Sequence, residues 1–160
     1  MLMLVLCGHE KKWLVGVGDH MQLNKIEEIL ALNHNAVFAT FRKSGAAQMS
    51  IVTVGTIDNT IAFTVSPGSA KLDNLKRDPR CSLLISRSDW GDYAVIEGQA
   101  NLLSPGVTST EDLRSTLREV YRAASGKEHP DWEEFDQAVQ KDQRSAIIVV
   151  PEHIYYGNAG

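Results

Sequence analysis

The sequence predicts a mainly β domain with helices, an α+β fold built as a six-stranded antiparallel barrel. Six short runs rich in β-branched and aromatic residues are separated by turn-forming residues, as is typical of strands. Most of these runs follow one another through short connections, which favours an antiparallel barrel over a doubly wound sheet. A barrel also removes the exposed edges that six short strands would otherwise present.

The central stretch, residues 48–86, holds three of these strands and one helix. Asp58 and Asn59 tolerate left-handed backbone, so they predict a tight turn between two strands. Leu72 and Leu75 have helical spacing, and Asp78-Pro79 ends the helix. In order, the elements are a strand at 49–54, the turn, a strand at 60–65, a loop at 66–69, a helix at 71–77 and a strand ending at 86.

Helices and strands are also predicted on both sides of this stretch. Asn24 and Glu27 resemble a capping box at the start of a helix, and Gly98 inside a long strand suggests a bulge or bend. Pro130 suits a first helical turn, and Pro151 interrupts the last strand. The predicted elements are a helix at 24–32, strands at 36–41 and 93–103, helices over 113–124 and about 132–139, and a strand at 146–150 that resumes at 154–156.

Length and composition indicate one domain of a globular protein in a reducing compartment. The chain has 160 residues, 43% of them hydrophobic, and a net charge of -4. An acidic balance without a basic cluster argues against nucleic-acid binding. The two cysteines, Cys7 and Cys81, form neither a disulfide framework nor a metal motif, so we expect a cytoplasmic protein with Cys81 buried.

The first 20 residues are expected to be an extension with little structure, and residues 21–160 to form the domain. The apolar run at 1–7 is too short to span a bilayer and lacks the flanks of a signal peptide, so no membrane association is expected. Gly16-Val17-Gly18 resembles the start of a dinucleotide fingerprint, but the third glycine is missing and no βαβ unit follows.

Few residues suggest a reaction carried out by the protein itself. The five histidines show no metal-binding spacing, and no nucleophile elbow or local triad is present, so no catalytic or metal-binding residue is predicted. Trp90 could wall a planar ligand, although packing or an interface is the commoner role of a loop tryptophan. Lys71 follows a hydroxyl-rich loop at a helix start, a corner that suits phosphate, although a solvated lysine is the commoner explanation. Any reaction therefore needs a bound cofactor.

Four segments resemble the pyridoxamine-phosphate-oxidase-like split β-barrel proteins, particularly the flavin- or deazaflavin-dependent oxidoreductases that use coenzyme F420. Together they extend from about Met21 to Gly157 and follow the same order as in that family. The segments are GAAQMSIVTV, FTVSPGSAKLDNLKRDPRCSLLIS, YAVIEGQANL, and GKEHPDWEEFDQAVQKDQRSAIIVVPEHIYYG.

The resemblance implies a homodimer with the cofactor in a groove at the subunit interface. Lys71, with Ser69, would hold the cofactor's phosphate, and the strand at 50–53 would offer backbone to its ring. Many relatives carry arginine at the position of Ser69, which leaves this chain one fixed cation there. The cofactor-binding residues implied are Ser50, Ile51, Val52, Thr53, Thr64, Val65, Ser66, Ser69, Ala70, Lys71 and Asn74.

Three functions remain open from the sequence. The first is hydride transfer from reduced coenzyme F420 to a small conjugated substrate. The second is an FMN-dependent oxidoreductase or oxidase, since one fold hosts both. The third is a non-catalytic protein that binds a flavin, a deazaflavin or haem.

Overall fold

The structure is a computed structural model that describes residues 20–158. The predicted extension lies outside the described residues, except for His20. The elements are α1 (His20–Leu30), β1 (Asn35–Phe41), β2 (Ala47–Thr53), β3 (Gly55–Ile57), β4 (Thr60–Val65), α2 (Ala70–Arg77), β5 (Arg80–Ser86), β6 (Asp92–Leu103), α3 (Thr110–Ser125), α4 (Trp132–Lys141) and β7 (Ser145–Asn158). None of the helices in this range is long and apolar enough to cross a membrane.

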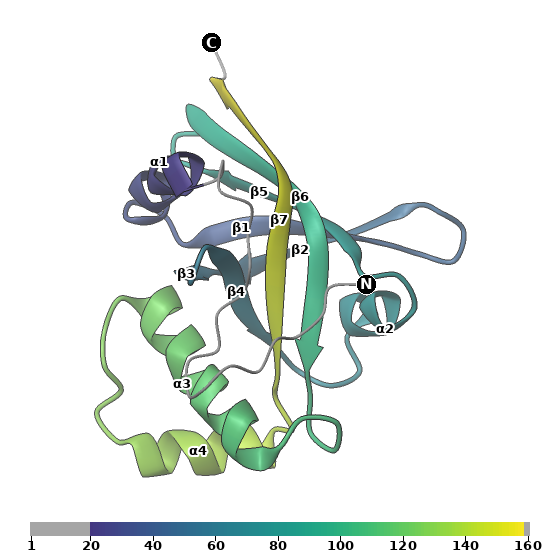
Figure 1. The fold of residues 1–160 in the computed structure, drawn as a ribbon, viewed down its shortest axis with the longest axis vertical. Helices are drawn as coiled ribbons and strands as arrows, with labels where there is room; N and C mark the ends of the chain where they lie inside the picture. Colours follow the sequence, from purple (N-terminus) through teal and green to yellow (C-terminus); the bar gives the residue numbers. More distant parts are fainter. Residues whose placement is uncertain (1–19, 159–160) are drawn as a thin grey trace.

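The strands form one curled antiparallel sheet in the order β2-β1-β5-β6-β7-β4-β3 (Figure 1). Between residues 20 and 158 there are seven strands, so the predicted number of six is wrong. The strand expected at 49–54 is β2, and the chain bends after it at Val54, which is fully buried and whose N–H donates to the His34 carbonyl. Strand β2 pairs with β1, whereas β3, over residues that were not predicted as a strand, pairs with β4. The predicted turn is confirmed, since Asp58 and Asn59 both have positive φ.

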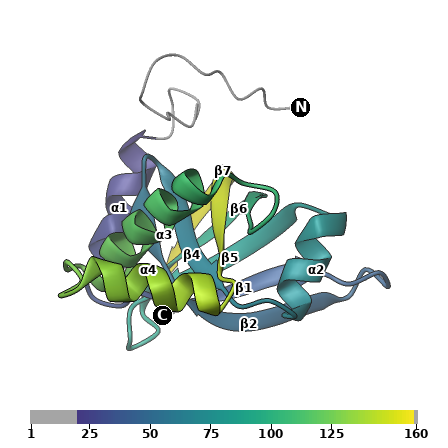
Figure 2. The same cartoon turned by 90° about the horizontal axis from the view of Figure 1, so that it is seen from below.

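Two apolar clusters stabilise the sheet. The larger fills the inside of the curl and includes Phe38 and Phe63, whose rings meet edge to face with centroids 4.8 Å apart. Helices α1 and α2 also contribute side chains to this interior. The smaller cluster lies between the outer face of β4 and β7 and helix α3, with α4 packed beside it (Figure 2).

The predicted bulge at Gly98 is confirmed. The register between β6 and β7 shifts between Glu97 and Gly98, which pair with His153 and Pro151. A Cβ at position 98 would lie 2.1 Å from the Val150 carbonyl oxygen, so only glycine fits there. The predicted interruption at Pro151 is wrong because the bulge accommodates the proline within one continuous strand.

The predicted helices are present, with corrections at two of their starts. Helix α1 begins at His20, so Asn24 lies inside the helix and does not cap it. Helix α4 is capped by Asp131, whose carboxylate accepts from the N–H groups of Glu133 and Glu134, and this leaves Pro130 just before the helix. Helix α3 ends as predicted at Gly126, which has a φ of 69°.

Candidate functional site

The two ends of the sheet meet at one point and leave open edges on either side of it. Strand β2 pairs only with β1, and β3 covers only the first half of β4, up to Ala62. Since a single residue separates β2 from β3, the free edge of β2 begins next to the uncovered end of β4. The backbone groups on the free edge of β2 and on the uncovered end of β4 have no strand partner in the described part of the chain.

The residues predicted to bind a cofactor lie along these edges and on the helix that follows. Ser50–Thr53 lie on β2, Thr64 and Val65 end β4, and residues 66–71 lead through a loop into α2, which packs against β1 and β2. The fold therefore brings the three predicted segments to one region. Val52 and Val65 belong to the interior cluster, so they can offer a ligand only backbone atoms, whereas Ile51 and Thr53 point outward.

Two hydroxyls in this region are buried without a hydrogen bond. The Oγ atoms of Ser50 and Ser69 have no partner among the described residues. Ser69 occupies the N-cap position of α2, yet its hydroxyl does not cap the helix. A buried polar group without a partner costs about 1–3 kcal/mol. Both serines were predicted cofactor contacts, and two unsatisfied hydroxyls on neighbouring elements fit a polar ligand there.

The start of α2 provides positive charge beside Ser69. The first N–H groups of a helix have no partner within it and carry the positive end of its dipole. Lys71 is half-buried, and no carboxylate within residues 20–158 pairs with it. A phosphate at this corner would meet backbone N–H groups, a hydroxyl and one ammonium, as predicted from the sequence.

Asn74, another predicted cofactor contact, is engaged in holding α2 in place. It is 8% exposed, and its Nδ2 donates to Thr40 Oγ1 on β1 at 3.0 Å. Thr40 donates in turn to Gln48 Oε1, and Arg77 donates to Asn74 Oδ1. This chain of bonds ties α2 to β1 and β2, so Asn74 positions the helix that carries Lys71.

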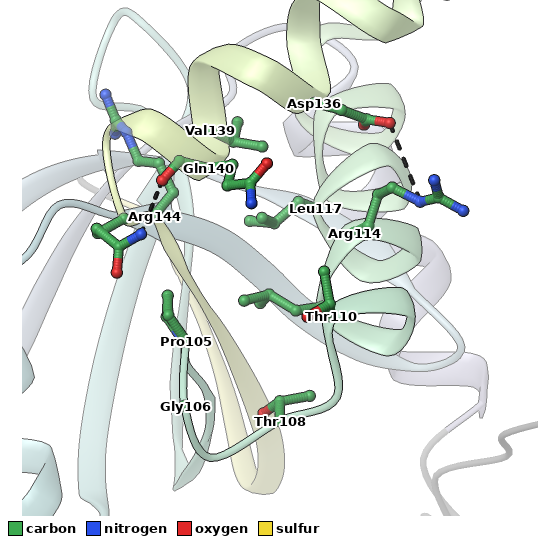
Figure 3. Close-up of a pocket in the computed structure, with 12 residues that line it drawn as sticks. Pro105, Gly106, Thr108, Thr110, Arg114, Leu117, Asp136, Val139, Gln140 and Arg144 are labelled. Atoms are coloured by element: carbon green, nitrogen blue, oxygen red, sulfur yellow. Dashed lines mark hydrogen bonds and ion pairs between the residues drawn. The ribbon is translucent and has the colours of Figure 1, made fainter.

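In a single chain, the predicted site is an open edge of the sheet. None of its residues lines either of two hollows that lie elsewhere among the described residues. The first is a cavity of about 160 Å³ between α3, α4 and the loop that follows β6. Leu117 and Val139 face it from the two helices, and the ion pair of Arg114 with Asp136 lies beside it, Nε to Oδ2 4.0 Å apart (Figure 3).

The second hollow gathers positive charge that the sequence analysis missed. It is an open depression of about 430 Å³, here called the basic hollow, between the β1–β2 hairpin and the C-terminal end of α2. Its lining residues are Phe41, Arg42, Lys43, Gly45, Arg77, Asp78 and Arg80. The absence of a basic cluster, read from the sequence, is therefore wrong. Residues 42–43 and 77–80 are far apart in the chain, and only the fold brings them together.

A second missed feature is an apolar row across the outer face of the sheet. Paired positions of five strands form one continuous row: Ile51, Val37, Leu84, Val95 and Tyr155. Ile51 is 70% exposed, and Met49, in the next row of paired positions, is 66% exposed. No described helix covers this face, because α3 and α4 pack on β3, β4 and the start of β7 (Figures 1 and 2). The sequence signal for this row was the spacing of Met49 and Ile51, which places two apolar side chains on the same face of β2.

Other candidate residues have ordinary surroundings. Cys81 is 3% exposed, as expected, and burial raises the pKa of its thiol to about 12, so it is not a reactive nucleophile. Trp90 is 63% exposed on the loop between β5 and β6 and has a φ of 61°. His129 packs against Tyr121, with ring centroids 5.1 Å apart, at the α3–α4 junction.

A curled antiparallel sheet with one open seam and a helix start beside it defines the split-barrel class of protein. A family model for pyridoxamine 5'-phosphate oxidase matches residues 23–157. The chain belongs to the pyridoxamine 5'-phosphate oxidase family.

Solved structures with the same fold are distant in sequence. A conserved hypothetical protein, Rv2991 of Mycobacterium tuberculosis, is 20% identical, with a TM-score of 0.68 over 84% of this chain and 83% of that one. A pyridoxamine 5'-phosphate oxidase-related, FMN-binding protein of Nostoc punctiforme is 12% identical, with a TM-score of 0.64 over 91% and 87%. A structure described as an F420 reductase is 18% identical, with a TM-score of 0.56 over 81% and 94%. The chain thus shares its fold with an FMN-binding protein and with an F420 reductase.

Proposed function

We propose that this protein is an oxidoreductase that binds coenzyme F420 at the seam of the barrel and reduces a small conjugated substrate. The observation that carries the proposal is the pair of buried, unpartnered hydroxyls of Ser50 and Ser69 beside Lys71 and two open strand edges. The residues present fit a planar cofactor with a phosphate. When bound, coenzyme F420 would supply the hydride.

In this proposal the protein binds, orients and excludes water. Lys71, the Ser69 hydroxyl and the N–H groups of residues 70–71 hold the phosphate. Thr64, Val65 and Ser66 follow the chain that links phosphate to ring, and the backbone of Ser50–Thr53 lies against the ring. Asn74 acts through Thr40, by fixing the helix that carries Lys71.

The alternative cofactor is FMN, and it would use the same residues. The FMN-binding Nostoc protein and the F420 reductase share this fold at low identity, so the choice of F420 depends on the four sequence segments that resemble F420-dependent relatives. A third candidate, haem binding, is the described function of a Mycobacterium smegmatis protein that is 20% identical, with a TM-score of 0.57 over 82% of this chain.

Titration of the purified protein with F420 and with FMN tests this proposal. We expect F420 fluorescence to change saturably with one cofactor per chain, and reduced F420 to be oxidised in the presence of an enone or quinone. FMN binding with no response to F420 would exclude the F420 assignment. Binding without turnover across a panel of enones and quinones would favour a carrier.

We also propose that two copies of the chain pair through the apolar row and so complete the cofactor site. The site of one chain is open, and its outward residue Ile51 belongs to that row. Pairing would cover exposed apolar surface at about 25 cal/mol per Å² and wall the open seam. Met49 and Ile51 would then be buried by the partner.

Met49→Lys is expected to convert the dimer to a monomer and to weaken cofactor binding. Met49 is 66% exposed in the single chain, so the substitution places a charge in the interface without disturbing the core. Sedimentation equilibrium measures the mass, and Val107→Lys, at a position 87% exposed on the loop before α3, is the matched control. A wild-type protein that is monomeric at micromolar concentration would contradict the proposal.

A further inference from the structure

The basic hollow concentrates positive charge in an otherwise acidic protein. Four cationic side chains and one carboxylate line it, which gives a net of three positive charges in a chain whose net charge is -4. Such a concentration of one sign in a concave surface focuses the field and attracts anions.

Part of this charge is already compensated, and part is free. Arg80 binds Asp78 through two nitrogens, Nη2 to Oδ2 2.8 Å apart, and this bond lowers the pKa of Asp78 to about 2, so the carboxylate stays ionised. Arg77 donates to the Phe41 carbonyl and to Asn74. The side chains of Arg42 and Lys43 at the hairpin tip have no partner in the described part of the chain.

The floor and the neighbourhood of the hollow favour a small ligand with several charges. The Phe41 ring lies 5.2 Å from the Arg80 guanidinium and gives one apolar wall. Helix α2 connects the hollow to Lys71, since Arg77 lies six positions after Lys71, about 9 Å along the axis. A molecule held at the start of α2 could therefore extend into the hollow.

We propose that the basic hollow is a second anion site, which takes a group with two or more carboxylates or phosphates. That group is either an acidic extension of the molecule whose phosphate lies at Lys71 or an unconnected anion. The first source rests on the proposed function, because the F420 molecule carries carboxylates beyond its phosphate, whereas FMN ends at its phosphate. The second source does not depend on that function.

Calorimetry with inorganic triphosphate at low ionic strength tests the site itself, since exposed charges are screened by salt. The variant Arg42→Gln/Lys43→Gln removes the two free cations from an exposed hairpin. Lys127→Gln/Lys141→Gln, on exposed positions of the α3–α4 region, removes the same charge elsewhere. We expect one triphosphate per chain, at least tenfold weaker binding in the hairpin variant and unchanged binding in the control. No binding to the wild type, or equal affinity in all three proteins, would overturn the proposal.

Titrations with F420 and FMN identify the source. If the hollow holds the cofactor's extension, triphosphate competes with F420 but not with FMN, and the hairpin variant loses at least tenfold in F420 affinity only. If the anion is unconnected, both cofactor affinities stay unchanged in the hairpin variant and triphosphate still binds beside them. Each result supports a second anion site. If neither cofactor binds, the proposed function fails, but the triphosphate measurement still shows whether the basic hollow binds an anion.

Discussion

Lys71→Ala is expected to weaken FMN or F420 binding by about 1.5–3 kcal/mol, or about 10- to 150-fold, the range for a hydrogen bond to a charged group. The ammonium is half-buried beside the start of α2 and has no ion-pair partner in residues 20–158. Its removal would leave the phosphate with only N–H groups and a hydroxyl. Fluorescence titration of wild type and variant measures the change.

Two comparisons separate this contact from a general effect on the protein. Riboflavin lacks the phosphate, so its affinity should be the same in wild type and Lys71→Ala. Lys76→Ala removes the same charge from the other end of the helix, where the side chain is 59% exposed and pairs with Asp73, and should leave FMN affinity unchanged. If Lys71→Ala bound FMN as tightly as the wild type, Lys71 would not be the phosphate anchor.

Phe63→Ala is expected to lower the free energy of unfolding by about 3–5 kcal/mol, the usual cost of a large cavity in a core. Phe63 is fully buried at the end of β4 and meets Phe38 edge to face. Typical domains are stable by about 5–15 kcal/mol, so the variant would lose a large share of that stability. Urea unfolding monitored by circular dichroism measures the difference.

Phe63→Leu keeps most of the apolar volume, so it should lose less stability and remain folded if the alanine variant does not. Leu32→Ala removes a side chain that is 66% exposed, so its stability should lie within about 0.5 kcal/mol of the wild type. Equal stability of Phe63→Ala and wild type would contradict the core described here. Because Phe63 lies at the uncovered end of β4, the leucine variant also tests whether cofactor binding depends on the shape of this edge.

Local patterns in the sequence predicted most of the fold. Asp58-Asn59, Gly98 and Gly126 each mark a position where only a few residue types fit the backbone, and each lies where the structure has its turn, bulge or helix end. The errors lie at positions where contacts between residues far apart in the sequence decide the backbone conformation. Strand β3 was missed because the burial of Val54 and its bond to His34 bend the chain and bring residues 55–57 against β4. Pro151 stays within β7 because the extra residue of the bulge, Glu152, lies next to it on the same strand.

For the site, the sequence by itself determined the segments: a β2 run, the end of β4, and a lysine at a helix start after a hydroxyl-rich loop. Only the tertiary structure decided that these segments meet at an open seam, with the hydroxyls of Ser50 and Ser69 buried and unpaired. It alone also gathered the basic hollow and the apolar row, in which Val37 and Tyr155 are 118 positions apart. The physical reason is that turns and helix ends depend on near neighbours, whereas burial and charge clusters depend on which strands pair.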